Sequence, residues 1–412
     1  MLDRLLAPVL IALAAIVTVG LSGCAYGPWQ RAEAPPVVFV HGDDAAATYW
    51  QDLVWRFESN GWPRSRLFAL QQPHPQAPDD DAVAQPGRSS DADQLAFLKT
   101  EVAQVLLKTG AKQVVLIGHG RGAYAIRNYI VKGGGDQTVS HAVLSWPDGL
   151  WAGANKKLSL ADYESTALKG VKSLVIPRSE QRDGAFSVAS FAAAYRFITG
   201  KPADNLTIWP QYDLVLDGLV TGMGVASGDR ASAGTHYFNN LPLSQAQLEI
   251  FVVQHDTGLR AGAAVYDKVV GPDGRWGPFQ AQQGARYEFV LRSPGYAVTH
   301  IYRSPFVRGT NFLHLKAERT ADEDLPAFAI IHLERPRGYM DPTVNHVSFD
   351  GQFPPPGVAV TGGGRVNRSK ITLNKLQYRA IAGEIHTDEV NRVTGRTWPA
   401  KESHMVRLEL AE

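Results

Sequence analysis

Hydrophobic positions in the first half of the chain follow two alternating patterns. Short runs rich in Val, Ile and Leu are typical of buried strands, and longer segments with apolar residues every three or four positions are typical of amphipathic helices. This alternation predicts βα units and a mainly parallel sheet flanked by helices. The predicted strands cover residues 35–40, 66–70, 113–117, 141–146 and 171–177, and helices are expected at 48–60, 91–109, 121–132 and 187–199.

A different pattern begins near residue 205. Apolar and polar residues then alternate with period two between turns rich in Gly, Asp and Pro, as in residues 246–255, 285–304 and 327–336. This pattern indicates all-β structure. We therefore expect an α/β domain at 35–204 and two β-rich units at 205–317 and 318–412.

The first 24 residues predict a secretory signal. A short charged start precedes an apolar run from Leu5 to about Val19, which is too short to favour a transmembrane helix. The following LSGC resembles the bacterial lipobox, in which the cysteine, here Cys24, carries diacylglycerol and becomes the first mature residue. The resemblance implies a lipid-anchored protein of the bacterial envelope, and Ala25 after the cysteine favours the outer membrane, facing the periplasm or the cell surface. A plainly cleaved secreted protein is the alternative.

Composition narrows the possible partners and stabilising bonds. Cys24 is the only cysteine among 412 residues, so no intramolecular disulfide can form. The formal net charge of +1 gives no reason to expect nucleic acid as a partner. A hydrophobic content of 44% is sufficient for ordinary cores, which must supply the stability.

The sequence GHGRG, residues 118–122, follows an apolar strand and precedes a helix. It resembles the nucleophile elbow of the α/β-hydrolase superfamily, in the lipase and esterase branch, where the pattern is G-x-S-x-G. The resemblance covers residues 35–200 and implies the α/β-hydrolase fold. Gly120 stands at the nucleophile position, and because glycine has no side-chain oxygen, no acyl-enzyme can form there.

The same resemblance implies an oxyanion loop after the first strand. Gly42 and Asp43 would lie in this loop, and the backbone N–H of Arg121 would be its second donor. His41 would support the loop and would not act as the base. Glycine at position 120 also suits the elbow, since its left-handed φ costs other residues about 1–3 kcal/mol and does not strain glycine.

The catalytic base is the second position to consider. In this superfamily an acid and then a histidine follow the nucleophile in the chain. No histidine occurs between His141 and His236, so the late position is empty. In secreted relatives the histidine lies shortly before a segment AF and a helix YRFITG. Both segments occur here, at residues 185–186 and 195–200, and the resemblance therefore implies that Gln181 stands at the histidine position.

Three further residues could take part in a site. His119 either packs under the turn or holds a water or ligand. Ser145, at the end of a predicted strand, either is structural or acts as a displaced nucleophile, because ligands of α/β folds bind at the carboxyl ends of strands. Asp148 either forms a turn or supplies an acid.

The β-rich half resembles a prealbumin-like sandwich of the carboxypeptidase-regulatory type. The segments that carry the resemblance are DGLVTG, VVQHDTG, GPDGRWGPF and YEFVLRSPGY. Such modules are usually spacers or binders. The histidines of this half are scattered without ligand spacing, so we expect no metal site and no cofactor.

These observations favour a pseudo-hydrolase, which keeps the pocket to bind an acyl or ester-like small molecule, or a protein partner. The main alternative is an active carboxylic-ester hydrolase that uses a displaced nucleophile or an activated water. A third interpretation treats the α/β domain as a scaffold for the β modules.

Overall fold

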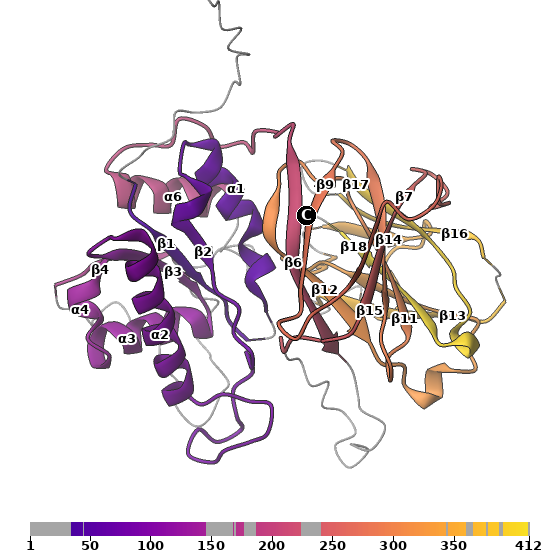
Figure 1. Ribbon diagram of the computed structural model, residues 1–412, viewed down its shortest axis with the longest axis horizontal. Helices are drawn as coiled ribbons and strands as arrows, with labels where there is room; N and C mark the ends of the chain where they lie inside the picture. Colours follow the sequence, from indigo (N-terminus) through magenta and orange to yellow (C-terminus); the bar gives the residue numbers. More distant parts are fainter. Residues whose placement is uncertain are drawn as a thin grey trace, which may run out of the picture.

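The computed structural model describes residues 34–410 except 44, 146–167, 169, 177–186, 224–239, 343–344, 360–365, 376–377 and 387–389. Figure 1 shows two parts side by side, an α/β part formed by the first half of the chain and a β part formed by the second half. Cys24, Asp148 and Gln181 lie outside the described residues. Within the described residues, none of the helices combines the length and the apolar character that crossing a bilayer requires.

The α/β part contains one five-stranded sheet in the order β2-β1-β3-β4-β5, with every neighbouring pair parallel. This confirms the predicted parallel sheet. Its strands are β1 (Val37–Val40), β2 (Leu67–Ala69), β3 (Val114–His119), β4 (Val139–Ser145) and β5 (Lys172–Ile176). The helical elements are η1 (Ala47–Trp50), α1 (Gln51–Ser59), η2 (Arg64–Arg66), α2 (Asp91–Thr109), α3 (Arg121–Lys132), α4 (Gly135–Thr138) and α6 (Val188–Thr199).

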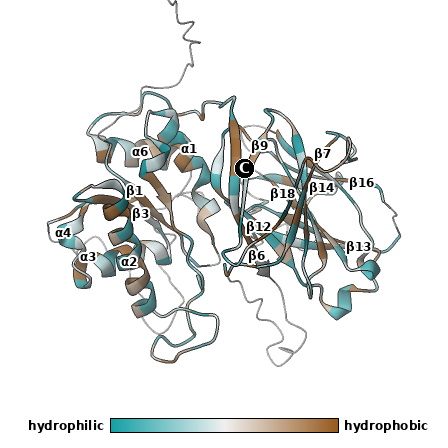
Figure 2. Cartoon of the chain, viewed as in Figure 1, coloured by the Kyte–Doolittle hydropathy of each residue, from teal (hydrophilic) through white to brown (hydrophobic). Residues whose placement is uncertain are grey.

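Burial of the strands explains why their sequences are continuous apolar runs that predict the sheet. All residues of β1 and β3 are buried, because helices cover both faces of the sheet. One core lies between the sheet and the helices α1 and α6, and the other between the sheet and the helices α2 and α3. Figure 2 shows the apolar colour on β1 and β3, inside the layer of helices.

Helix α2 illustrates how local signals set the element boundaries. The Ser90 side chain accepts a hydrogen bond from the N–H of Asp93, and the Asp93 carboxylate accepts one from the N–H of Ser90. This capping box satisfies two N–H groups that the first turn leaves open. Gly110 ends the helix in the left-handed conformation, with φ of 66°. The helix therefore covers the predicted range, 91–109.

The β part has three layers of strands. The central layer is a seven-stranded sheet in the order β15-β13-β18-β11-β10-β7-β8, and the outer layers are the three-stranded sheets β12-β6-β9 and β14-β16-β17. The strands are β6 (Leu214–Met223), β7 (Gln247–Val253), β8 (Tyr266–Val269), β9 (Arg275–Ala281), β10 (Arg286–Arg292), β11 (Val298–Arg303), β12 (Thr310–Glu318), β13 (Ala329–Glu334), β14 (His346–Phe349), β15 (Arg368–Leu373), β16 (Ala380–His386), β17 (Val390–Arg396) and β18 (His404–Glu409). A hydrophobic core fills each space between layers.

The central sheet draws strands from both sides of the predicted boundary at residue 317. Strand β11 pairs in parallel with β18, and β18 pairs in parallel with β13. Residues 205–317 and 318–412 therefore both contribute strands to this sheet.

The two parts are joined through helix α1. The Nε1–H of Trp55 donates to the carbonyl of Gly309 over 2.9 Å, and the Nδ2–H of Asn60 donates to the carbonyl of Asn205 over 2.7 Å. The carboxylate of Asp52 lies 3.0 Å from Nε of Arg337, and both side chains are buried. Because the ion pair is buried and the two hydrogen bonds are partly buried, the β part is held against the face of the α/β part that carries η1 and α1.

Candidate functional site

The turn between β3 and α3 has the geometry expected of a nucleophile elbow. Gly120 sits at φ of 55° and ψ of −126°, a conformation that side chains rarely adopt. Its N–H donates to the carbonyl of Ser145 over 3.0 Å, which fixes the turn against β4. A Cβ atom added at Gly120 would meet no heavy atom of the described residues within 4 Å. The position therefore has room for a side chain, and the missing hydroxyl is not a consequence of crowding.

The two flanking glycines are needed for steric reasons. A Cβ at Gly118 would lie 2.8 Å from the backbone nitrogen of Ala123, and one at Gly122 would lie 2.2 Å from the carbonyl oxygen of Val40. Real Cβ atoms do not approach backbone atoms so closely. The close packing of strand, turn and helix thus requires glycine at both positions of the GHGRG sequence.

The loop after β1 lies directly beside the turn. A Cβ at Gly42 would be 3.4 Å from the backbone nitrogen of Arg121 and 3.7 Å from Cα of Gly120. The His41 ring is fully buried, with Nδ1 2.9 Å from the carbonyl of Gly42, while Nε2 accepts from the N–H of Gln72 over 3.2 Å. The ring is thus neutral, with its proton on Nδ1.

His41 holds two loops together. Burial lowers its pKa from 6.5 to about 4, in spite of the hydrogen bond to Gly42. Since both ring nitrogens are engaged with the backbone, neither is available to take a proton from a substrate. The structure thus gives His41 a supporting position in the loop that contains Gly42 and Asp43.

Arg121 follows the turn and sends its side chain into the protein, where it is only 1% exposed. The guanidinium donates to the carbonyl of Pro75 over 3.3 Å and to the hydroxyl and carbonyl of Ser89. It also lies 3.8 Å from a carboxylate oxygen of Asp43 and 3.7 Å from one of Asp91. Arg121 therefore ties the long 71–90 loop and the start of α2 to the turn.

His119 and Ser145 are neighbours across the β3–β4 pair, and both are buried. The ring of His119 packs against Tyr49, with 5.3 Å between centroids. The described residues of the α/β part contain His41, His74, His119 and His141, and no hydrogen bond joins any of them to the hydroxyl of Ser145 among the contacts described.

A residue of the β part also contributes to the surroundings of the site, and the sequence did not predict this contribution. The side-chain amide of Asn240 donates to the carbonyls of Ala45 and Gln72, at 3.0 and 2.8 Å, and its N–H donates to the carbonyl of Pro73. Asn240 is 2% exposed. This residue thus fixes both loops that flank Gly120, and its role depends on contacts that span about half of the chain.

Strand β12 brings a second group of polar side chains towards the same loops. Nε2 of His314 lies 2.6 Å from the hydroxyl of Thr221 on β6. Burial lowers the pKa of Lys316 from 10.5 to about 8, and the ammonium group in turn disfavours protonation of His41 and His314. The electrostatics of the two parts are therefore coupled across their junction.

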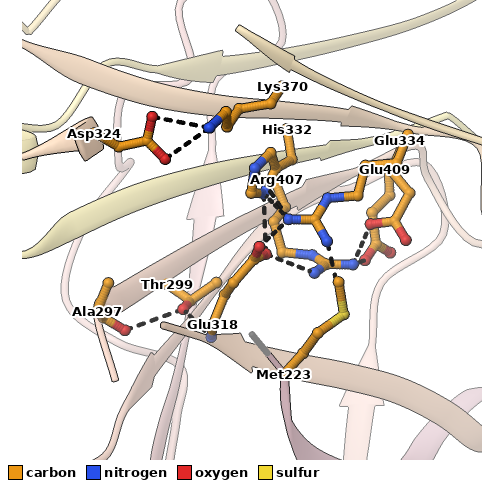
Figure 3. Close-up of polar contacts among 11 residues, drawn as sticks. Met223, Ala297, Thr299, Glu318, Asp324, His332, Glu334, Lys370, Arg407 and Glu409 are labelled. Carbon is orange, nitrogen blue, oxygen red and sulfur yellow. Dashed lines mark hydrogen bonds and ion pairs between the residues drawn. The ribbon is translucent and has the colours of Figure 1, made fainter. Parts of the chain in front are cut away.

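A buried network of charges lies beyond Lys316, between β12 and the central sheet. Figure 3 shows the guanidinium of Arg407 among three carboxylates, those of Glu318, Glu334 and Glu409. Arg368 and His332 also contact the carboxylate of Glu318, with His332 Nδ1 2.9 Å from it. Such charges are tolerated in the interior because each is paired and hydrogen-bonded.

The comparisons with known proteins agree with this arrangement. Residues 34–145 match the family model of class 2 lipases, and residues 216–320 match the model of a lipase C-terminal domain. No curated protein matches the chain. The second model is a lipase domain, and the resemblance of this region to a carboxypeptidase-regulatory module stays a prediction.

Solved structures show low similarity. An extracellular α/β-hydrolase from a Paenibacillus species is 15% identical, with 28% of this chain and 43% of that chain covered and a TM-score of 0.21. The esterase RhEst1 from Rhodococcus sp. ECU1013 is 22% identical, covering 30% and 42%, with a TM-score of 0.22. The propeptide form of the Bacillus licheniformis lipase BlEst2 is 11% identical, covering 90% and 95%, with a TM-score of 0.28.

The chain spans less than half the length of the first of these structures. The α/β part has the α/β-hydrolase fold, and its residues 34–145 resemble class 2 lipases. A C-terminal β-sandwich region follows, in which residues 216–320 resemble a lipase C-terminal domain.

Proposed function

We propose that the α/β domain is a non-catalytic pseudo-hydrolase that binds an acyl or ester-like ligand. The observation that carries this proposal is the state of the turn at Gly120. The backbone has the elbow conformation and the space for a side chain is open, yet no hydroxyl is present to attack a carbonyl. The frame for ligand binding is thus kept while the nucleophile is absent.

The surrounding loops support the same proposal. His41, Arg121 and Asn240 are buried and fix the backbone around the turn through hydrogen bonds. A rigid backbone beside an open position favours binding, because the protein is already ordered and little of the binding free energy is spent on ordering it. A protein partner that inserts a side chain at Gly120 would use the same space.

Ester hydrolysis by a displaced nucleophile is the second candidate. One observation favours it, namely that Ser145 ends β4 next to His119 and accepts the N–H of Gly120 on its carbonyl. A hydroxyl at this place would be close to a carbonyl bound at the turn. The base would have to come from elsewhere in the chain or from a water molecule.

We also propose that the protein is anchored to the bacterial outer membrane through lipid on Cys24. The support is the sequence of residues 1–24 alone. Incorporation of labelled palmitate into the protein, lost in Cys24→Ala, is the expected result. Labelling that persists in this variant would overturn the anchor.

The catalytic question is tested with p-nitrophenyl octanoate. We expect the native protein and Ser145→Ala to release nitrophenol at the same rate, since Ser145 performs no chemistry. We expect the double variant Gly120→Ser, Gln181→His to gain turnover if the frame is intact. Release that survives repurification and disappears in Ser145→Ala would refute the non-catalytic proposal.

Ligand binding is tested by calorimetric titration with octanoate and with monooctanoylglycerol. The variant Gly120→Phe should abolish binding, because its ring fills the open space above the turn. Gly110→Phe is the matched control, since Gly110 also has a positive φ with no neighbour within 4 Å but lies at the end of α2. Equal binding by both variants would place the ligand away from the turn.

A further inference from the structure

A chain of ionisable side chains crosses three neighbouring strands of the central sheet. Oε1 of Glu288 on β10 lies 2.7 Å from Nδ1 of His300 on β11, and Nε2 of His300 lies 2.8 Å from Nδ1 of His404 on β18. Strand pairing brings these residues together, since β11 is antiparallel to β10 and parallel to β18. None of them takes part in the site around Gly120.

Hydrogen-bond partners fix every proton along this chain. Glu288 accepts from Nε of Arg260 over 2.6 Å and from the hydroxyl of Tyr302 over 2.9 Å. Burial alone would raise the pKa of Glu288, but the hydrogen bonds from His300 and Arg260 lower it below its usual value, so the carboxylate is ionised. An ionised carboxylate only accepts, so Nδ1 of His300 must donate.

The rest follows from the chemistry of neutral imidazole. With its proton on Nδ1, His300 must accept at Nε2, and Nδ1 of His404 must be the donor. The remaining nitrogen, Nε2 of His404, therefore carries a lone pair. It has no hydrogen-bond partner among the described residues, and the His404 ring is only partly buried, whereas His300 and Glu288 have no exposed surface. The chain thus leads from a buried carboxylate to one oriented lone pair.

The immediate surroundings hold this arrangement rigidly. The indole of Trp398 stacks on His300 with 4.1 Å between centroids and an interplanar angle of 7°, and it lies parallel to His404. The guanidinium of Arg260 packs over Trp398 and Phe251. Nη2 of Arg260 is a buried N–H group without an acceptor among the described residues. A cationic donor is therefore held beside the two imidazoles.

We propose that Glu288, His300 and His404 form a second acid–base centre, in which Nε2 of His404 is a nucleophile for activated acyl groups. The parts correspond to those of other nucleophilic sites, namely a nucleophile, a base oriented behind it and a third group that orients the base. His404 is the catalytic residue, and Glu288 and His300 are positioning residues.

The reaction balances with water as the only co-reactant. Nε2 of His404 attacks the acyl carbon, the bond to the leaving oxygen breaks and the leaving group departs with its electron pair. The acylated ring then loses the Nδ1 proton to Nε2 of His300, and His300 can pass its own Nδ1 proton to Glu288. Water hydrolyses the acylimidazole to the carboxylic acid, and the protons return along the same path.

Burial, aided by nearby cations, lowers the pKa of both imidazoles and so favours their neutral forms. Burial lowers the pKa of His404 from 6.5 to about 4, with further contributions from His300, Arg292 and Arg260. Burial likewise lowers the pKa of His300, against the raising effect of Glu288. The other charged group nearby is Glu249, which pairs with Arg292 at 3.1 Å. The lone pair of His404 is thus available at pH values where an ordinary histidine is protonated.

The test uses diethyl pyrocarbonate, an activated acyl donor, on the native full-length protein. The modification rate of His404 is followed by peptide mapping between pH 5.5 and 7.5, beside N-acetylhistidine. The neutral fraction of an ordinary histidine falls about tenfold over this range. We expect the rate at His404 to change by less than about twofold. An unmodified His404, or a rate that falls as the reference does, would overturn the proposal.

Catalysis is tested with p-nitrophenyl acetate. The variant His404→Gln should lose the release of nitrophenol, whereas His255→Gln, which removes a ring that is 57% exposed and belongs to no such chain, should keep it. In Glu288→Gln the side-chain amide can donate to Nδ1 of His300, so the proton positions along the chain are no longer fixed, and we expect the rate of His404 modification to fall at every pH while N-acetylhistidine is unaffected. Full release by His404→Gln would refute the centre.

The outcome also separates this centre from the site at Gly120. Release that depends on His404 supports the second centre and leaves the non-catalytic proposal intact. Release that depends on Ser145 refutes the non-catalytic proposal. If Glu288→Gln fails to fold, the pH profile of the native protein still decides the question.

Discussion

Substituting alanine at three glycines tests how the turn is built. Gly120→Ala places a Cβ in open space, so its cost is backbone strain of about 1–3 kcal/mol, reduced by about 0.4–1 kcal/mol because alanine restricts the unfolded chain. We expect a net loss of about 1–2 kcal/mol in the free energy of unfolding. Gly110→Ala, at φ of 66° and equally open, should lose a similar amount.

Gly122→Ala has a different physical cost. Its Cβ would lie 2.2 Å from the carbonyl oxygen of Val40 and 2.6 Å from that of His41. No side-chain rotation relieves a clash with backbone, so β1 and α3 must move apart and both cores loosen. Overpacking of this kind costs about 1–3 kcal/mol and occasionally more, and rigid backbone on both sides puts this case at the upper end, about 3 kcal/mol or above.

Urea unfolding measures the three variants under one set of conditions. The midpoint and the m-value give the change in the free energy of unfolding, and an unchanged m-value indicates that the folded and unfolded states are otherwise comparable. The reasoning fails if Gly122→Ala loses no more stability than Gly120→Ala. It also fails if Gly120→Ala loses more than about 4 kcal/mol, since strain alone does not reach that value.

Three further predictions concern buried polar groups. Because burial lowers the pKa of His41 to about 4, the unfolded chain binds more protons than the folded protein between pH 4 and 6.5. The neutral ring contributes about 3 kcal/mol to the free energy of unfolding above pH 6.5, and this contribution is lost as the pH falls towards 4. His41→Asn should flatten the pH dependence of the urea midpoint in this range, and an unchanged slope would contradict this. Asp52→Asn breaks the buried pair with Arg337 and should lower the free energy of unfolding by about 3–5 kcal/mol. Asp267→Asn, on the surface, serves as the control, and equal losses of stability in the two variants would refute the role of the buried pair. Arg121→Leu should speed proteolysis within residues 71–90, and an unchanged cleavage rate would show that the loop is held otherwise.

Local signals accounted for most of the α/β part. Helix α2 was predicted over its correct range because the signals at its two ends lie within the helix and its immediate neighbours. The turn at Gly120 was predicted because crowding makes glycine obligatory at Gly118 and Gly122. The α/β-hydrolase fold and the β-rich second half were predicted correctly from such patterns.

Long-range pairing accounts for what the sequence did not reveal. Asn240 fixes the loop at Ala45 across 195 residues, and no local pattern marks it. His300 and His404 were considered scattered because they are 104 residues apart, yet the pairing of β11 with β18 places them in contact. Strands β16 and β17 were missed since their exposed faces are polar and weaken the apolar signal.

The position of β18 has a consequence for the order of folding during synthesis. This strand is synthesised after all other strands of the central sheet, but it lies between β13 and β11 in the middle of that sheet. Until residues 404–409 emerge, β11 and β13 present unpaired edges, which are prone to pair with other chains. The α/β domain can form early from local contacts, whereas the central sheet of the β part has to wait for β18. A nascent chain of this protein therefore depends on protection of these edges until β18 has been synthesised.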